Sequence, residues 1–199
     1  MGAEMLGSLF LLTLRSPARA VRALRAQNLP MAERWMAAIV AVSVSALLNW
    51  VLSTMVNAPE ATGAATPMMS LSRQPLLFAA LQFGAVLITA TLMARVGQLF
   101  GGTGGFADAL LLVTWVEVML LSVQLAQILL LVIFPPLAAL LGLAALVLFI
   151  GLTVLFTKEL HEFDNVAKVA LGVVLTAMAA VFVMSFLAAA FGILPEVPA

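Results

Sequence analysis

The chain has 199 residues, of which 64% are hydrophobic and only 9% are charged, and its nine basic side chains balance its nine acidic ones. Because an ordinary soluble domain is about 25% charged, these values exclude a soluble globular fold, intrinsic disorder and a nucleic-acid-binding protein, and they predict an integral membrane protein. The absence of cysteine also excludes disulfides and thiol catalysis.

The first 34 residues are expected to form a segment at the membrane surface. The stretch Met5–Leu14 is apolar, but it is shorter than the roughly 20 residues that a spanning helix needs. Ser16 and Pro17 are typical of the N-cap and the first position of a helix, and this helix is expected to end near Asn28. Residues 1–34 are therefore predicted to be a unit separate from the membrane-spanning part.

One face of this short helix is basic. Helical spacing places Val21 and Leu24 outside an arc that holds four arginines. These are Arg15, Arg19, Arg22 and Arg25. The pattern predicts an interfacial amphipathic helix that contacts anionic lipid headgroups, and the same charges also serve as a plain topology signal.

Five apolar stretches follow, each long enough to cross a bilayer. They cover residues 35–56, 76–100, 106–134, 136–157 and 166–193. Pro135 and Pro136 divide the long apolar run in the middle, because proline ends one helix and begins the next. The chain is therefore expected to be an all-α, polytopic helical bundle, with a five-helix transmembrane domain over residues 35–199.

The basic residues gather on one side of the predicted membrane. Besides the four arginines above, Arg34, Arg95, Lys158 and Lys168 all lie on the side of the N-terminus. Only Arg73, in a long loop at 57–75, lies on the other side. Positive charge near short loops stays in the cytoplasm, so the N-terminus is expected inside and the C-terminus outside.

Glu117 is the one acidic residue expected near the middle of the bilayer, about 17 Å into the third span at 1.5 Å per residue. An ionisable side chain there costs roughly 2.5–3.5 kcal/mol and marks a functional candidate. Because a glycine-rich turn makes the second and third spans antiparallel neighbours, Thr89 is expected opposite Glu117, and Gln82 opposite Gln124. These four residues form a predicted intramembrane polar seam.

Two interpretations of this seam remain open. Amide and hydroxyl pairs can simply hold helices together, whereas Glu117 can also relay a proton or cation. Asn49 and Gln127 are further candidate members. Nearer the cytoplasmic surface, Arg95 and Asp108 are expected to form a charge pair.

The turn between the second and third spans is rich in glycine: Gly101, Gly102, Gly104 and Gly105. A tight interhelical turn accounts for these glycines without a ligand. The alternative is a phosphate cradle at the N-terminus of the third span, where free N–H groups attract anions. Asp108 competes for that same positive helix end.

The loop after the fourth span is the other charged segment. Glu159, His161, Glu162 and Asp164 can ligate a metal, but the spacing matches no metal motif and there is no second histidine. A solvated loop is the favoured interpretation, with Asp164 as the N-cap of the fifth span. No metal or cofactor is expected.

The stretch Phe100–Phe106, followed by Ala109, Leu110 and Trp115, resembles the Yip (Ypt/Rab-interacting protein) domain family. The early Ser16-Pro17 pair and residues 156–163 are similar to the bacterial members of that family. The resemblance implies five spans, a cytoplasmic N-terminus and the bacterial inner membrane. Eukaryotic relatives bind prenylated small GTPases, but their Asp-Leu-Tyr-Gly-Pro motif is absent from this chain, so no GTPase partner is carried over.

The residues and the resemblance together predict a non-enzymatic membrane protein that organises membrane lipids or partner proteins. The expected partners are anionic lipid headgroups, a second copy of the chain or other membrane proteins, and no nucleic acid. The alternative is a small transporter or channel component that uses the polar seam around Glu117.

Overall fold

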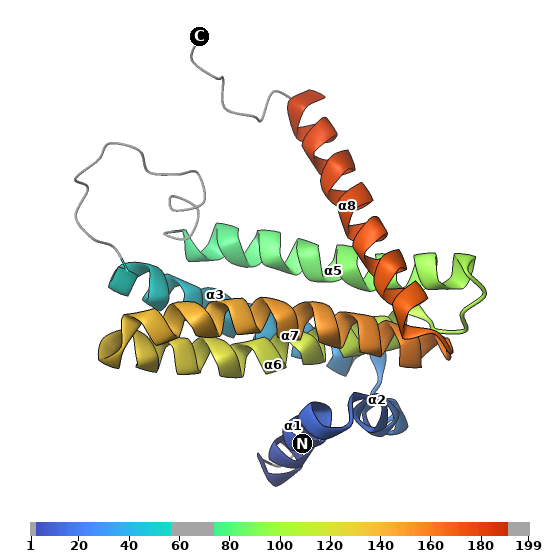
Figure 1. Cartoon of the computed structure of the whole chain (residues 1–199), viewed down its shortest axis with the longest axis horizontal. Coiled ribbons are helices and arrows are strands. Elements are labelled where there is room, and N and C mark those ends of the chain that lie inside the picture. Colours follow the sequence, from blue (N-terminus) through green and yellow to red (C-terminus); the bar gives the residue numbers. More distant parts are fainter. Residues whose placement is uncertain (1–2, 57–73, 191–199) are drawn as a thin grey trace.

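The computed structural model describes residues 3–56 and 74–190, and all regular structure in these ranges is helical (Figure 1). The helices are α1 (Ala3–Arg15), α2 (Pro17–Ala26), α3 (Met31–Val56), α5 (Pro75–Leu99), α6 (Phe106–Ile133), α7 (Pro135–His161) and α8 (Val166–Ala190). The predicted all-α, polytopic bundle is confirmed. Most of the predicted 57–75 loop, including Arg73, and the predicted end of the last span at residue 193 lie outside the described residues.

Five of these helices are long and apolar enough to cross a membrane: α3, α5, α6, α7 and α8. The proline pair divides α6 from α7 as predicted, since α7 begins at Pro135. Two boundaries differ from the prediction by more than one residue. The first span begins at Met31 rather than Trp35, and the fourth continues to His161 instead of ending at Thr157.

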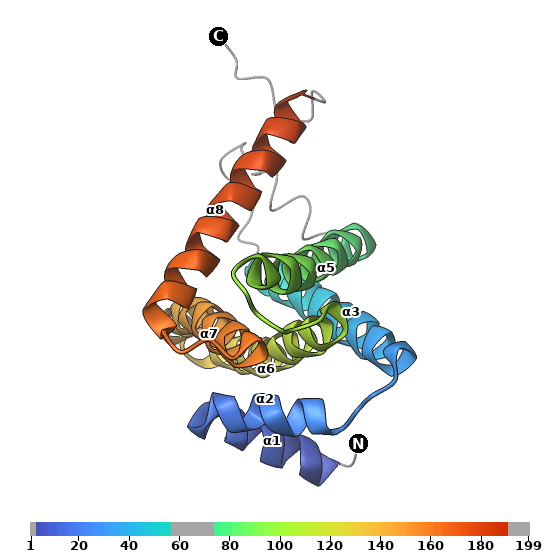
Figure 2. The same ribbon diagram turned by 90° about the vertical axis from the view of Figure 1, so that its right-hand side faces the viewer.

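Helix α6 is the centre of the bundle. It packs against α3, α5 and α7, which run beside it (Figures 1 and 2). As a result, the consecutive residues from Ala109 to Val116 are all buried. A helix that is apolar on every side is typical of such a central position.

Helix α8 diverges from the other spans. It starts beside the end of α7 and then tilts away from the bundle (Figures 1 and 2). Large apolar side chains such as Leu175, Val181 and Phe182 are exposed along it. In a membrane protein these side chains face lipid or a partner.

The two N-terminal helices run across one side of the bundle (Figure 2), with α2 toward one end and α1 nearer the middle (Figure 1). The apolar face of α2 is turned to the bundle, with Val21 and Leu24 each 1% exposed. Helix α1 is fixed by Trp115, whose Nε1–H donates to Thr13 Oγ1 at 2.9 Å. Pro17 begins α2 after Ser16, as predicted. We call this end of the bundle, formed by the start of α3, the α5–α6 turn and the end of α7, the basic end.

Candidate functional site

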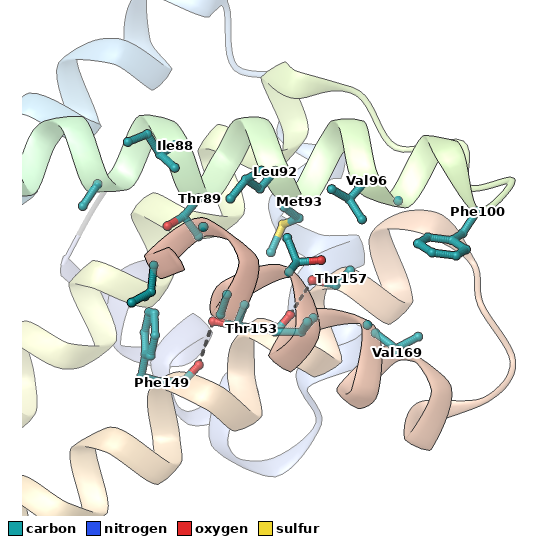
Figure 3. A pocket seen from close by; sticks show the side chains of 18 of the residues that line it. Ile88, Thr89, Leu92, Met93, Val96, Phe100, Phe149, Thr153, Thr157 and Val169 are labelled. Atoms are coloured by element: carbon teal, nitrogen blue, oxygen red, sulfur yellow. Dashed lines mark hydrogen bonds between the residues drawn. The ribbon is translucent and has the colours of Figure 1, made fainter. Parts of the chain in front are cut away.

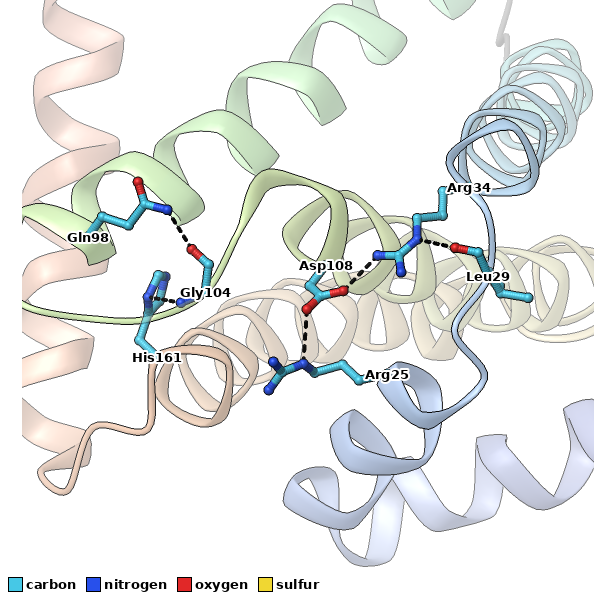
Figure 4. A network of polar contacts seen from close by, with 7 residues as sticks. All are labelled: Arg25, Leu29, Arg34, Gln98, Gly104, Asp108 and His161. Carbon is cyan, nitrogen blue, oxygen red and sulfur yellow. Dashed lines mark hydrogen bonds and ion pairs between the residues drawn. The ribbon is translucent and has the colours of Figure 1, made fainter.

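A single carboxylate ties three segments together at the basic end (Figure 4). Arg34 Nη1 lies 2.7 Å from Asp108 Oδ1, and Arg25 Nε lies 3.1 Å from Asp108 Oδ2. Arg34 is buried and also donates through Nε to the Leu29 carbonyl at 2.9 Å. Asp108, in the first turn of α6, therefore anchors α2 and the start of α3 to the centre of the bundle, and its charge suits that helix end.

The predicted pair between Arg95 and Asp108 is not formed. Both carboxylate oxygens of Asp108 are taken by Arg25 and Arg34, whereas Arg95 is exposed on α5. The prediction considered only the hairpin of α5 and α6, and it ignored α2 and α3, which approach the same carboxylate. Arg25 accordingly faces the bundle, in contrast to its predicted role at lipid headgroups.

The other three predicted headgroup arginines are exposed. Arg15 and Arg19 lie at the α1–α2 junction, and Arg22 is 67% exposed while contacting Glu159 at 3.5 Å. An ion pair at this exposure contributes little. Helix α1 exposes large apolar side chains beside them. We define the α1–α2 surface as Met5, Leu6, Leu11, Leu14, Arg15, Arg19 and Arg22.

His161, the last residue of α7, is buried in the turn between α5 and α6 (Figure 4). Its Nδ1 accepts a hydrogen bond from the Gly104 N–H at 3.1 Å, and its Nε2 lies 2.9 Å from the Met93 carbonyl oxygen. Because an amide N–H only donates and a carbonyl only accepts, this geometry requires the neutral imidazole with its proton on Nε2. His161 thus links α7 to α5 through Met93 and to the turn through Gly104.

Three glycines make room for this ring. A Cβ added to Gly97 or Gly102 would overlap the imidazole of His161, and one added to Gly104 would overlap Leu160. Gly101 has φ +88°, a left-handed conformation that favours glycine. We call His161 with Gly97, Gly102 and Gly104 the histidine latch. The Gly104 amide already serves His161, so it is not free for the phosphate cradle that was the alternative interpretation of this turn.

The prediction of a solvated loop after the fourth span is wrong at His161. Helix α7 continues to this residue and ends there, and Glu162, whose φ is +59°, is its C-cap. Asn165, and not Asp164, caps α8, because its Oδ1 accepts from the Lys168 backbone N–H at 3.1 Å. The signal that could have revealed this is the four-residue spacing of Leu152, Phe156 and Leu160, all buried, which runs on toward the histidine.

The polar seam exists, but three helices build it. Gln82 Nε2 on α5 donates to Ser45 Oγ on α3 at 2.8 Å and to Glu117 Oε2 on α6 at 3.1 Å. Ser45 in turn lies 3.5 Å from Gln124 Oε1. The seam borders a pocket of about 340 Å³ that Asn49 and Gln127 also line. Ser45 was not among the residues predicted for this seam.

Thr89 is not part of this seam. It lines a separate groove of about 1050 Å³ between α5, α7 and α8 (Figure 3). The prediction failed because counting residues from the turn gives the depth of a residue in the membrane. It does not give the rotation of the helix about its axis, which decides the direction of the side chain. Most of the groove is apolar, and its lining includes Leu92, Val96, Phe149, Thr153, Thr157 and Val169.

Five apolar helices and a partly buried polar seam define the class of this protein, a polytopic helical membrane protein. Residues 11–187 match the family described as the Yip1 domain, so the chain belongs to the Yip family of membrane proteins. The match covers α2 and the histidine latch as well as the spans. Comparison with curated proteins and with solved structures finds no match.

Proposed function

We propose that this Yip-family protein is a non-enzymatic organiser of anionic membrane lipids in the bacterial inner membrane, with its N-terminus in the cytoplasm. The α1–α2 surface carries the proposal. It combines the exposed apolar side chains of α1 with the exposed arginines of α2. Apolar insertion beside basic side chains is how interfacial helices bind anionic bilayers.

The way in which α2 packs explains why two helices are needed. An isolated amphipathic helix inserts its own apolar face into lipid, but Val21 and Leu24 of α2 are buried against the bundle. Leu11 and Leu14 of α1 are about half exposed and supply the apolar face instead. Arg25 ties α2 to Asp108 and Thr13 ties α1 to Trp115, and these contacts hold the basic side chains at one position relative to the spans.

Neutralising Arg19 and Arg22 together tests this role. A basic side chain near an anionic surface contributes about 1 kcal/mol, so R19Q/R22Q is expected to weaken phosphatidylglycerol retention by at least about tenfold. Native mass spectrometry of protein taken from mixed phosphatidylglycerol and phosphatidylcholine micelles measures this. R95Q removes one charge from the same end but not from the α1–α2 surface, and should keep the preference. Unchanged selectivity in R19Q/R22Q would reject the proposal.

The seam supports a second candidate, a small transporter or channel component. The observation in its favour is the pocket of about 340 Å³ at which Ser45, Gln82 and Glu117 meet. An acidic side chain beside such a space in the membrane is a candidate proton or cation relay. The competing role is purely structural, since Gln82 already bonds Glu117.

The substitution Glu117→Gln separates these two roles. The glutamine keeps a hydrogen-bonding partner for Gln82, so the fold is expected to survive, while a relay loses its titrating group. If the seam transports protons, dye-reported flux in liposomes falls at least about tenfold. Thr89→Val, which alters the other cavity, serves as the control. Equal flux in the Gln variant, or no flux in the wild-type protein, removes this candidate.

A further inference from the structure

The groove between α5, α7 and α8 is a further cavity in the described part of the chain, and the seam and the α1–α2 surface do not account for it. At about 1050 Å³ it lies at the upper end of the size of ligand sites. Along α8 it runs from Lys168 to Ser185, which is about 25 Å at 1.5 Å per residue. Figure 3 shows its walls, with Leu92 and Val96 on one side and Phe149 on the other.

We propose that this groove binds one zwitterionic glycerophospholipid that carries a primary ammonium, the phosphatidylethanolamine class. Its acyl chains would lie along the apolar walls, and its headgroup would sit at the basic end. The proposal adds a second lipid site to the α1–α2 surface and uses none of the residues of that surface.

The dimensions of the groove favour acyl chains over a helix. About 1050 Å³ spread over about 25 Å gives a mean cross-section of about 40 Å². A helix of about 10 Å diameter has about twice that cross-section, so a second helix does not fit without moving α8. Small residues keep the groove open, and a Cβ added at Gly172 meets no atom within 4 Å. Gly172 therefore lines an open space and not a contact between two helices.

The charges at the mouth of the groove select the headgroup. Lys168 and Asp164 both line it, both are exposed, and neither forms an ion pair within the residues that the structure describes. Asn165 caps α8, which leaves the Asp164 carboxylate unused by the helix. A lysine suits the lipid phosphate, and a carboxylate suits an ammonium that can donate hydrogen bonds. A quaternary choline has no such donor, and a purely anionic headgroup would be repelled by Asp164.

Native mass spectrometry of the full chain, taken from micelles with equal amounts of phosphatidylethanolamine, phosphatidylglycerol and phosphatidylcholine, tests this proposal. The wild-type chain is expected to retain one phosphatidylethanolamine. D164N should shift retention toward phosphatidylglycerol, and K168Q should lower phospholipid retention about fivefold, the effect of one lost basic contact.

A steric pair of variants localises the site. Gly172→Phe fills the groove and should abolish the retained lipid, whereas Leu175→Phe, at an exposed position of α8 outside the groove, should leave it in place. Equal retention of all three lipids, retention unaffected by Gly172→Phe, or a dimer that Gly172→Phe disrupts would overturn the proposal. Because R19Q/R22Q alters only the α1–α2 surface, failure of one proposal leaves the other testable.

Discussion

Replacing Gly97 by alanine is expected to lower the free energy of unfolding by about 3 kcal/mol. The added methyl group would occupy the space of the His161 imidazole, so the ring would have to leave its buried site. Overpacking costs about 1–3 kcal/mol, and each buried hydrogen-bonding group left without a partner costs a further 1–3 kcal/mol or so. These costs exceed the gain of about 1 kcal/mol in helix propensity from glycine to alanine. Thermal or denaturant unfolding in mild detergent, followed by circular dichroism, measures the change.

Gly84 provides a matched control on the same helix. It also lies in α5, but a Cβ there meets no atom within 4 Å. Gly84→Ala should therefore be neutral or stabilising by up to about 1 kcal/mol. If Gly97→Ala is equally harmless, the histidine latch is not a tight fit.

A double-mutant cycle assigns the cost to the ring. In a His161→Ala background the obstacle to the new methyl group is gone, so Gly97→Ala should have little further effect. Contacting residues show such coupling, whereas independent sites add. Additive effects of the two substitutions would show that Gly97 is needed for some reason other than His161.

The spans could be predicted because composition and proline report directly on membrane crossing. Hydrocarbon requires long apolar helices, and Pro135 marks where one ends and the next begins. Helical periodicity likewise predicted that Arg22 and Val21 lie on different faces of α2. Periodicity, however, does not say what an apolar face packs against. It could not show that the apolar face of α2 is turned to the bundle, while α1 exposes large apolar side chains.

The missed features depend on partners far apart in the sequence. His161 stands among charged neighbours, so local composition suggests a solvated loop, and only the approach of Gly97 and Gly104 shows that it is buried. Asp108 likewise takes its partners from helices about 75–85 residues earlier. Thr89 was misplaced because the rotation of α5 about its axis is set by its packing against α3 and α7 as well as α6. Pairwise reasoning within one hairpin does not contain that information.

Asp108→Ala is the second change with a large expected effect, a loss of about 3 kcal/mol in the free energy of unfolding. The substitution leaves the buried Arg34 guanidinium without its carboxylate, and removing one partner of a buried ion pair typically costs about 3–5 kcal/mol. Partial exposure of Asp108 places the effect at the lower end of that range. Unfolding in mild detergent gives the value, and Glu33→Ala, an exposed acid on α3, should change it by less than about 0.5 kcal/mol.

The same variant should release α2 from the bundle, because Arg25 loses its only ion-pair partner among the described residues. Trypsin cleavage after Arg22 and Arg25 is then expected to accelerate before the spans unfold, since local opening exposes a segment without global unfolding. The double variant R34M/D108A removes the orphaned charge and should recover much of the stability, yet it still lacks the anchor for Arg25. If R34M/D108A recovers stability, but trypsin still cleaves it faster and its selectivity for phosphatidylglycerol is still lost, Asp108 has two separable roles. It neutralises Arg34 for the fold, and through Arg25 it holds the α1–α2 surface in place for lipid binding.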